Sequence, residues 1–174
     1  MAGSETPSVF IITGAMAAGK STVAEALARR LPKSVHLRGD VFRRMIVNGA
    51  APMGAVLSED GLAQLELRQR LACQAARAYA QAGFAVVYQD ILIGEALARV
   101  AESLADLAPR VVVLDPRPDI LGKRAAERQK RGYDENFRPE VLAQALARET
   151  PRLGLWIDSS EMTADEVVER ILAG

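Results

Sequence analysis

The chain contains one cysteine and one histidine, and this scarcity excludes several kinds of site. Because Cys73 is the only cysteine, no disulfide can form within the chain. That pattern fits a reducing compartment, and we expect the protein to be cytoplasmic. One histidine cannot build a zinc site, so His36 is interpreted as a structural residue.

Long apolar runs are also missing. No run approaches the roughly 18 apolar residues that a transmembrane helix needs, so we expect no membrane partner. Residues 1–8 have neither a basic segment nor a long apolar stretch, which argues against a signal peptide. We expect residues 1–7 to form a flexible N-terminal tail and residues 8–174 to form one domain.

The chain has no excess of charge of either sign. Its 22 basic and 22 acidic residues give a formal net charge of zero. This balance argues against a large surface for duplex nucleic acid and does not favour nucleic acid as a partner, although a local basic groove is still allowed. No feature of the sequence indicates an oligomeric state.

Short apolar runs alternate with longer helical stretches, a pattern typical of a parallel α/β sheet. We expect strands at residues 9–13, 34–37, 84–88, 110–114 and 155–157. We expect helices at residues 21–31, 40–47, 61–81, 95–107, 119–130, 139–149 and 163–172. Right-handed crossovers between parallel strands then place helices on both faces of the sheet.

The segment between the first strand and the first helix fits the pattern G-x-x-x-x-G-K-[ST] completely. Its glycines let the backbone approach phosphates closely, and its N–H groups and the following helix start favour anions. Lys20 is expected to reach the β- and γ-phosphates, and the Ser21 hydroxyl to bind Mg²⁺. The cofactors predicted are therefore ATP and Mg²⁺. The residues assigned to nucleotide contacts here are Gly14, Ala15, Met16, Ala17, Ala18, Gly19, Lys20, Ser21 and Thr22.

Two acidic residues follow predicted strands and are expected to lie at the carboxyl edge of the sheet, where open parallel sheets bind ligands. Asp40 is placed to accept the proton of an attacking hydroxyl, or alternatively to cap a helix. Asp90 ends an apolar strand and is assigned to the metal and the substrate, with a plain turn as the alternative. If Asp90 is the base, Asp40 becomes the substrate binder. Arg43 or Arg44 is expected to face the same crevice.

Basic residues are concentrated between Lys123 and Arg131. Arg124 and Arg128 are four residues apart and share one helix face, which Arg131 roughly continues. We interpret residues 119–138 as a helical lid, in which these guanidinium groups clamp the transferring phosphoryl group. Arg128 and Arg131 are assigned to catalysis and Arg124 to nucleotide binding. The alternative is a solvated amphipathic helix.

Five segments together resemble the chloramphenicol phosphotransferase-like and zeta-toxin-like AAA ATPase family of small P-loop kinases, with gluconate and adenylylsulfate kinases as more distant relatives. They are GAMAAGKS, HLRGDVFR, VVYQD, LDPRPDILGKRAAERQKRGY and LWIDSSEMTADEVVERIL. The resemblance covers roughly residues 8–172. It implies a three-layer P-loop NTPase fold with strand order 2-3-1-4-5 and a lid. It also implies that Asp40 is the general base, in a D-x-x-R pattern completed by Arg43, and that Arg124, Arg128 and Arg131 make lid contacts.

The sequence departs from that family at the acceptor side. Chloramphenicol phosphotransferase has a paired aspartate at its third strand, where this chain has Gln89 and Asp90. Residues 48–60 match no pattern of the family, and such a loop shapes an acceptor pocket. The resemblance therefore gives a reaction type and leaves the acceptor open.

The first hypothesis is an ATP- and Mg²⁺-dependent kinase acting on the hydroxyl of a small molecule: an antibiotic, with a role in resistance, a sugar acid or a related metabolite. Apolar residues at positions 50–57 slightly favour a partly apolar acceptor. A second hypothesis is a toxin-type nucleotide-sugar kinase, in which Arg43, Arg44 and Arg68 contact a phosphorylated acceptor. A third is a regulatory NTPase or nucleotide-binding switch, ranked lower because no N-K-x-D motif is present.

Overall fold

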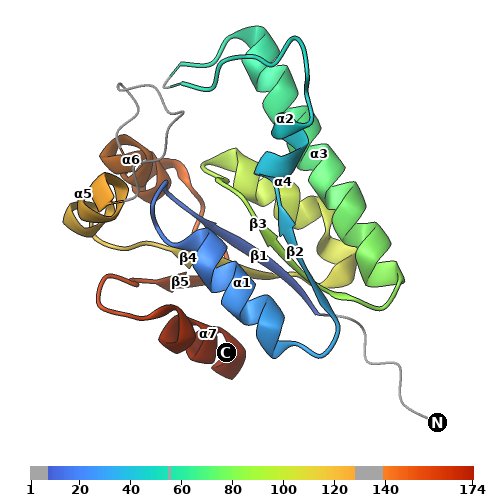
Figure 1. The fold of residues 1–174 in the computed structure, drawn as a ribbon, viewed down its shortest axis with the longest axis vertical. Helices are drawn as coiled ribbons and strands as arrows, with labels where there is room; N and C mark the ends of the chain where they lie inside the picture. The colour runs from blue at the N-terminus through green and yellow to red at the C-terminus, as the bar shows by residue number, and fades with distance from the viewer. Residues whose placement is uncertain (1–7, 55, 128–138) are drawn as a thin grey trace.

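The computed structural model describes residues 8–54, 56–127 and 139–174, and a parallel sheet runs through its centre (Figure 1). The strands are β1 (Val9–Gly14), β2 (Ser34–Arg38), β3 (Ala85–Gln89), β4 (Arg110–Leu114) and β5 (Leu155–Ile157). They form one five-stranded sheet in the order β2-β3-β1-β4-β5. The strand order that the family resemblance implied is confirmed.

Helices cover both faces of this sheet. They are α1 (Lys20–Arg30), α2 (Asp40–Arg44), α3 (Glu59–Gln81), α4 (Glu95–Ser103), the 3₁₀ helix η1 (Ala105–Leu107), α5 (Pro118–Glu127), α6 (Pro139–Glu149) and α7 (Ala164–Ala173). None of the helices in the described part of the chain is long and apolar enough to cross a membrane.

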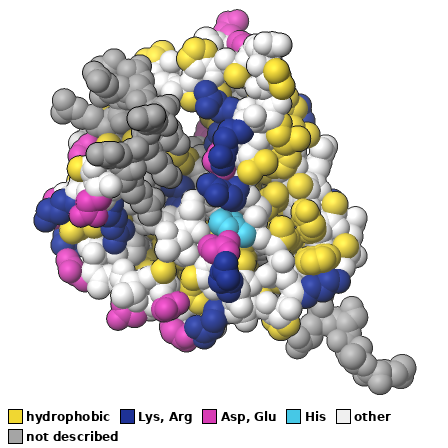
Figure 2. Space-filling view, in the orientation of Figure 1, with side chains coloured by type: hydrophobic (Ala, Val, Ile, Leu, Met, Phe, Trp, Pro, Cys, Tyr) yellow, Lys and Arg dark blue, Asp and Glu magenta, His cyan; other side chains and the backbone are white. Residues whose placement is uncertain are grey.

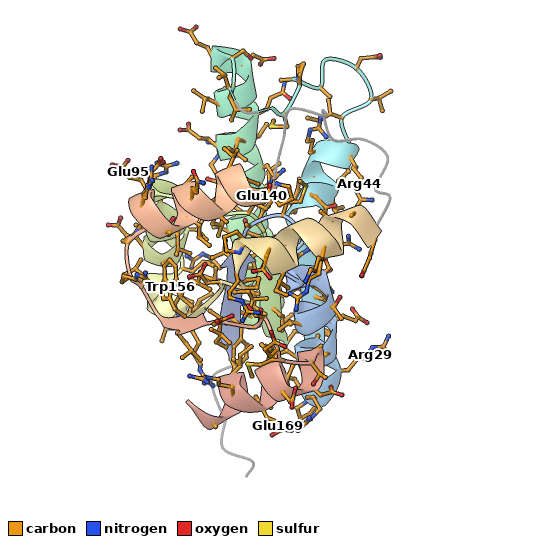
Figure 3. The ribbon with its side chains drawn as sticks, turned by 90° about the vertical axis from the view of Figure 1, so that its left-hand side faces the viewer. Arg29, Arg44, Glu95, Glu140, Trp156 and Glu169 are labelled. Atoms are coloured by element: carbon orange, nitrogen blue, oxygen red, sulfur yellow. The ribbon has the colours of Figure 1, made fainter. Side chains whose placement is uncertain are left out.

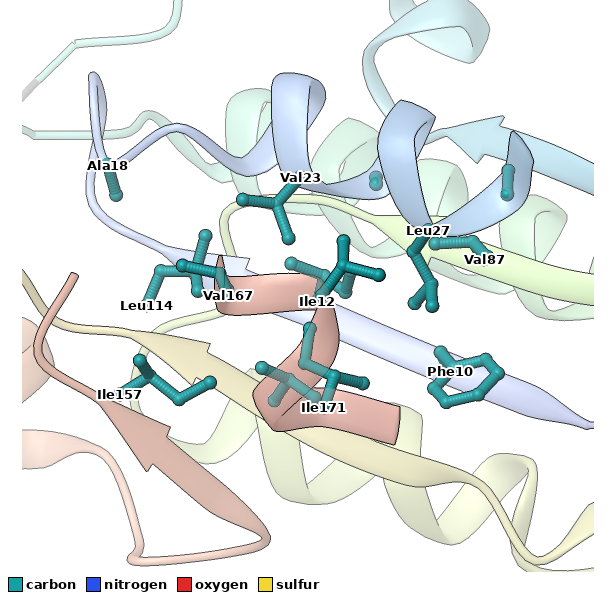
Figure 4. Packing of buried hydrophobic residues seen from close by; sticks show 14 of the residues in the cluster. Phe10, Ile12, Ala18, Val23, Leu27, Val87, Leu114, Ile157, Val167 and Ile171 are labelled. Carbon is teal, nitrogen blue, oxygen red and sulfur yellow. The ribbon is translucent and has the colours of Figure 1, made fainter. Parts of the chain in front are cut away.

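The central strand β1 is buried on both sides, and its side chains alternate between the two halves of the core. Phe10 and Ile12 pack in the cluster that α1 and α7 complete, as Figure 4 shows. Val9 and Ile11 pack in the cluster that α3 and α4 complete. The continuous apolar run of the sequence is therefore the signature of a strand covered on both faces.

Three helices differ from their predicted bounds by two or more residues within the described part of the chain. The helix predicted from residue 40 to 47 ends at Arg44, and Val47 is 91% exposed, so no core contact extends it. The helix predicted over residues 95–107 gives way to η1 after Leu104, a tighter turn that lets Leu104 and Leu107 pack on the sheet. The third, α3, begins at Glu59 because Ser58 caps it, accepting a 3.0 Å hydrogen bond from the Gly61 N–H.

The predicted lid is described only in part. Arg124 lies on α5, whereas Arg128 and Arg131 lie outside the described residues. The two helices on either side, α5 and α6, pack against each other.

Ile171 and its neighbour Leu172 on α7 allow a matched test of this core. Ile171 is fully buried and Leu172 is 38% exposed. We expect Ile171→Ala to lower the free energy of unfolding by about 2–5 kcal/mol, because it removes buried methyl groups and leaves a cavity. Leu172→Ala should cost clearly less. Urea unfolding without nucleotide measures both, and equal losses would contradict the packing of α7 described here.

Candidate active site

The loop between β1 and α1 has a strained backbone. A Cβ added at Gly14 would lie 2.5 Å from the Leu114 carbonyl oxygen, so only glycine fits there. Ala17 has a φ of 65°, a left-handed conformation that costs a non-glycine residue about 1–3 kcal/mol. The Ala18 N–H donates to the Ala15 carbonyl at 3.2 Å and closes the turn. Strain of this kind is typical of ligand-binding loops.

Two basic side chains lie against this loop. The Lys20 ammonium donates to the Ala15 carbonyl at 2.7 Å. Arg124 reaches over from α5, donating from Nη1 to the Ala18 carbonyl at 3.4 Å and from Nη2 to the Ser159 carbonyl at 3.0 Å. The structure therefore brings the loop and the first lid arginine together, as the sequence suggested.

A surface groove of about 660 Å³ begins at the loop and runs between α1 and β2. Its lining residues are Ser21, Thr22, Glu25, Ala26, Arg29, His36 and Arg38. Figure 2 shows basic side chains in a column on this face, with acidic side chains and the histidine among them. His36 Nδ1 lies 2.9 Å from the Glu25 carboxylate, and this contact lowers the pKa of Glu25. The pairing agrees with a structural role for His36.

Asp40 is the first residue of α2 and lies at the carboxyl edge of the sheet, just past β2. Gly39 occupies the N-cap position, and no side-chain capping bond forms, so the carboxylate of Asp40 is not used as a helix cap. Arg44, labelled in Figure 3, donates to Asp40 Oδ2 at 2.6 Å, and Arg38 Nε lies 3.6 Å from Oδ1. The Asp40 side chain is 43% exposed as a whole, while its Oδ1 is buried and accepts no hydrogen bond from the described residues.

Asp90 lies directly after β3 and is almost completely buried. Both of its oxygens accept hydrogen bonds from the Arg68 guanidinium, with Nε at 3.2 Å. The Tyr88 hydroxyl at 3.2 Å and the Ile91 N–H at 2.8 Å complete the set. Burial raises the pKa of Asp90, while the positive charge of Arg68 opposes part of that rise. In this structure both carboxylate oxygens of Asp90 therefore accept hydrogen bonds from other groups of the protein.

The backbone of Gly39, immediately before Asp40, packs directly against the Asp90 side chain. A Cβ added at Gly39 would lie 2.0 Å from Asp90 Oδ2, and the Gly39 N–H donates to the Gln89 carbonyl at 3.0 Å. The sequence singled out both aspartates but not this contact or the need for glycine between them. The glycine immediately before Asp40 was the available signal, since glycine often marks close approach of a backbone.

The parallel strands place the remaining predicted residues as follows. Gly14, Asp40 and Asp90 share the carboxyl edge of the sheet, because β1, β2 and β3 are neighbouring parallel strands. Arg43 is half-buried beside this edge, and its Nη2 lies 3.5 Å from the Ala51 carbonyl. Within the described residues, no three His, Cys, Asp or Glu side chains gather into a metal-binding group. Ser21 and Asp90 as metal ligands therefore stay predictions.

Comparison with known proteins gives a family and a fold. Residues 9–151 match the family described as "AAA domain". No curated protein matches the chain at a significant level. Among solved structures, the tunicamycin resistance protein of Deinococcus radiodurans is 18% identical, with a TM-score of 0.68 over 97% of this chain and 95% of that chain.

Two further structures share this fold. A gluconokinase from Sinorhizobium meliloti 1021 is 20% identical, with a TM-score of 0.63 over 97% of this chain and 91% of its own. The Mycobacterium tuberculosis APS kinase CysC, in complex with AMPPNP and APS, is 18% identical, with a TM-score of 0.65 over 96% and 97%. At these identities the likeness shows the fold alone, and that fold is the three-layer P-loop fold expected from the sequence.

The Arg68–Asp90 pair generates a stability prediction. Asp90→Asn leaves the mostly buried Arg68 charge without its counter-ion, so we expect the free energy of unfolding to fall by about 3–5 kcal/mol. The matched control is Asp106→Asn, which breaks the exposed Arg77–Asp106 pair and should change stability little. Urea unfolding measures both variants, and an unchanged stability for Asp90→Asn would show that the pair does not hold this edge together.

Proposed function

Because the chain belongs to the AAA-domain family, we propose that it is an ATP- and Mg²⁺-dependent phosphotransferase with a small-molecule hydroxyl as its acceptor. The observation that carries the proposal is the arrangement of the strained phosphate loop and Asp40 along one edge of the sheet. The loop supplies a place for the phosphates, and the carboxylate supplies a proton acceptor beside it. The kinase-fold neighbours support the same reaction class.

The phosphate loop fits the triphosphate of ATP. The helix α1 begins at Lys20 with its positive end toward the loop, which favours an anion there. Lys20 would pair with the β- and γ-phosphates, and Arg124 would approach them from α5. Ser21 would bind Mg²⁺ through its hydroxyl, with Asp90 in the surrounding shell. The bound ion would supply positive charge that offsets the charge of the phosphates.

Asp40 would serve as the general base. Its carboxylate accepts the proton of the acceptor hydroxyl as that oxygen forms a bond to the γ-phosphorus. The bond between the γ-phosphorus and the bridging oxygen breaks, and ADP leaves with the electron pair. Lys20 and Arg124 would offset the charge that develops on the phosphoryl oxygens and the leaving group. Arg128 and Arg131 are proposed to add to that clamp from the lid.

The acceptor class stays broad at this level. The tunicamycin resistance neighbour supports including antibiotics among the candidates, and the gluconokinase neighbour supports including sugar acids. The arginines around Asp40 keep a toxin-type nucleotide-sugar kinase as a second candidate, since phosphorylated acceptors need several positive charges. We also propose that the protein acts in the cytoplasm.

The role of Asp40 predicts a specific kinetic defect. We expect Asp40→Asn to lower phosphate transfer by about 10²–10⁴-fold while ATP binding is retained, because the amide cannot take the proton. The assay follows ADP release and acceptor mass over a panel of antibiotics, sugar acids, nucleosides and nucleotide sugars. Asp165→Asn on α7 is the control. Transfer at the wild-type rate in Asp40→Asn would assign the base elsewhere, with Asp90 the next residue to test.

The role of Lys20 predicts a loss of nucleotide contacts. Lys20→Ala should weaken binding of Mg²⁺-ATP and reduce transfer together, because the ammonium is assigned to the phosphates in both states. Lys33→Ala removes an ammonium at the opposite edge of the sheet, where Lys33 donates to the Ala82 carbonyl, and should leave ATP binding unchanged. Isothermal titration with AMPPNP reads out binding, and equal affinities for wild type and Lys20→Ala would reject the loop as the phosphate site.

A further inference from the structure

The strand β2 forms one edge of the sheet, and within the described residues it is paired on one side only, with β3. All of its residues are partly exposed, whereas those of the central strand β1 are buried. An edge strand presents unpaired backbone N–H and C=O groups, which can pair with a further strand. The outer side of β2 is therefore a candidate interaction surface.

The hydrogen bonds to β3 show which backbone groups of β2 point to the open side. The Ala85 N–H donates to the Lys33 carbonyl at 2.8 Å. The Gly39 N–H donates to the Gln89 carbonyl at 3.0 Å. Successive residues of a strand direct their backbone groups to alternate sides, so the odd-numbered residues from 33 to 39 face β3. The residues that direct their N–H and C=O groups to the open edge are Ser34, His36 and Arg38.

The surroundings of this edge leave room for another strand. The groove of about 660 Å³ lies between α1 and β2, so on that face α1 does not cover the outer side of the strand. The basic and acidic side chains that Figure 2 shows here largely neutralise one another. Each of the two carboxylates, Glu25 and Asp40, is paired with basic side chains of its own chain. A molecule with the same charges is therefore not strongly repelled.

We propose that two copies of this chain associate through β2, antiparallel and about a two-fold axis at His36, so that their sheets join into one. In that register His36 lies opposite its own counterpart, and Ser34 lies opposite Arg38 of the second copy. All three outward-facing residues of each strand are then hydrogen-bonded, because such pairs recur at every second residue of an antiparallel ladder. The two-fold axis repeats each contact, as an isologous dimer requires. This inference does not depend on the proposed phosphotransferase function.

The side chains of β2 suit this register on both faces of the sheet. Val35 lies opposite Leu37 of the second copy, and both are partly buried residues that pack on the α3 side of the core. Apolar side chains opposed in this way stabilise strand pairing. On the α1 side the two His36 rings meet at the axis, where each lies 2.9 Å from a Glu25 carboxylate. No two arginines are directly opposed.

A second copy fits this edge better than an unrelated strand. The side chains of β2 are symmetric in kind about His36, with apolar residues at positions 35 and 37 and polar residues at 34 and 38. Any other two-fold register leaves at least one outward-facing residue of each strand unpaired. A five-residue strand alone buries less than the roughly 800 Å² per partner of a standard interface. We therefore expect a reversible dimer with a dissociation constant of about 1–100 µM.

Sedimentation velocity of the full chain at about 1–300 µM tests the dimer. We expect a monomer–dimer equilibrium. His36→Pro should abolish the dimer, because proline is tolerated on the open side of an edge strand but has no N–H to donate. His36→Ala is the matched control, since it removes the same imidazole, retains the N–H and should still dimerise. Thermal unfolding checks that both variants are folded.

Two substitutions of Ser34 test the register without depending on His36→Pro. Both remove the hydrogen bond from the Ser34 hydroxyl to the Ala28 carbonyl, so they are matched in that local loss. Ser34→Glu places a negative charge opposite Arg38 of the second copy and should tighten the dimer. Ser34→Lys places a positive charge there and should weaken it. The two dissociation constants should differ by about 3-fold or more.

Cross-linking gives a second measure of the register. With oxidised glutathione, His36→Cys should form a disulfide-linked dimer, because hydrogen-bonded antiparallel pairs have Cα atoms about 5.5 Å apart, within disulfide range. Ser34→Cys is the control, since position 34 and its counterpart lie four residues apart along the ladder, roughly 13 Å, which is too far. The native Cys73 is buried.

Three results would overturn the inference. A monomer at every concentration would leave this edge to a partner other than the chain itself. A dimer that persists in folded His36→Pro would place the interface elsewhere. Equal cross-linking of His36→Cys and Ser34→Cys, or equal dimer affinities for the two charged Ser34 variants, would reject the register centred on His36.

Discussion

The buried contact between Arg68 and Asp90 organises the part of the molecule where Asp40 lies. It joins the middle of α3 to the end of β3, and Gly39 rests directly on the Asp90 carboxylate. Removing a carboxylate from water is costly, and the bidentate arginine, the Tyr88 hydroxyl and a backbone N–H offset that cost only when all are in place. A network with so few alternative arrangements fixes where the chain leaves β2, and therefore where Asp40 stands.

A second constraint acts on the phosphate side. The loop after β1 holds Ala17 in a left-handed conformation and Gly14 against the backbone of β4. Such a conformation persists only because the surrounding structure over-determines it, here through a strand buried on both faces and the packing of α1. Because folding already imposes this strained conformation, the backbone N–H groups of the loop are arranged before an anion binds. Arg124 extends this preorganised surface from α5.

The two ends of the proposed site, the loop after β1 and the region around Asp40, are built from different kinds of structure. The phosphate loop is built from backbone and small residues, which suits a ligand shared by many proteins. The side that carries α2 is built from side chains of α2, α3 and the loop whose Ala51 N–H donates to Gln64, all of which lie outside the strands. Because these elements lie outside the sheet, substitutions on their surface can be accommodated without disturbing the strands.

Most helices could be predicted from the sequence to within two residues, and the family resemblance implied the strand order. The helices follow from local signals such as apolar runs and their spacing, whereas the strand order rests on the resemblance alone. The sequence did not predict that Arg68 neutralises Asp90, nor that Gly39 must lack a side chain, because both depend on the packing of distant segments. Arg68 and Asp90 are 22 residues apart, and no periodicity predicts which of several arginines meets a given carboxylate. That choice is made by the packing of α3 on the sheet, where burial makes a wrong pairing too costly to persist.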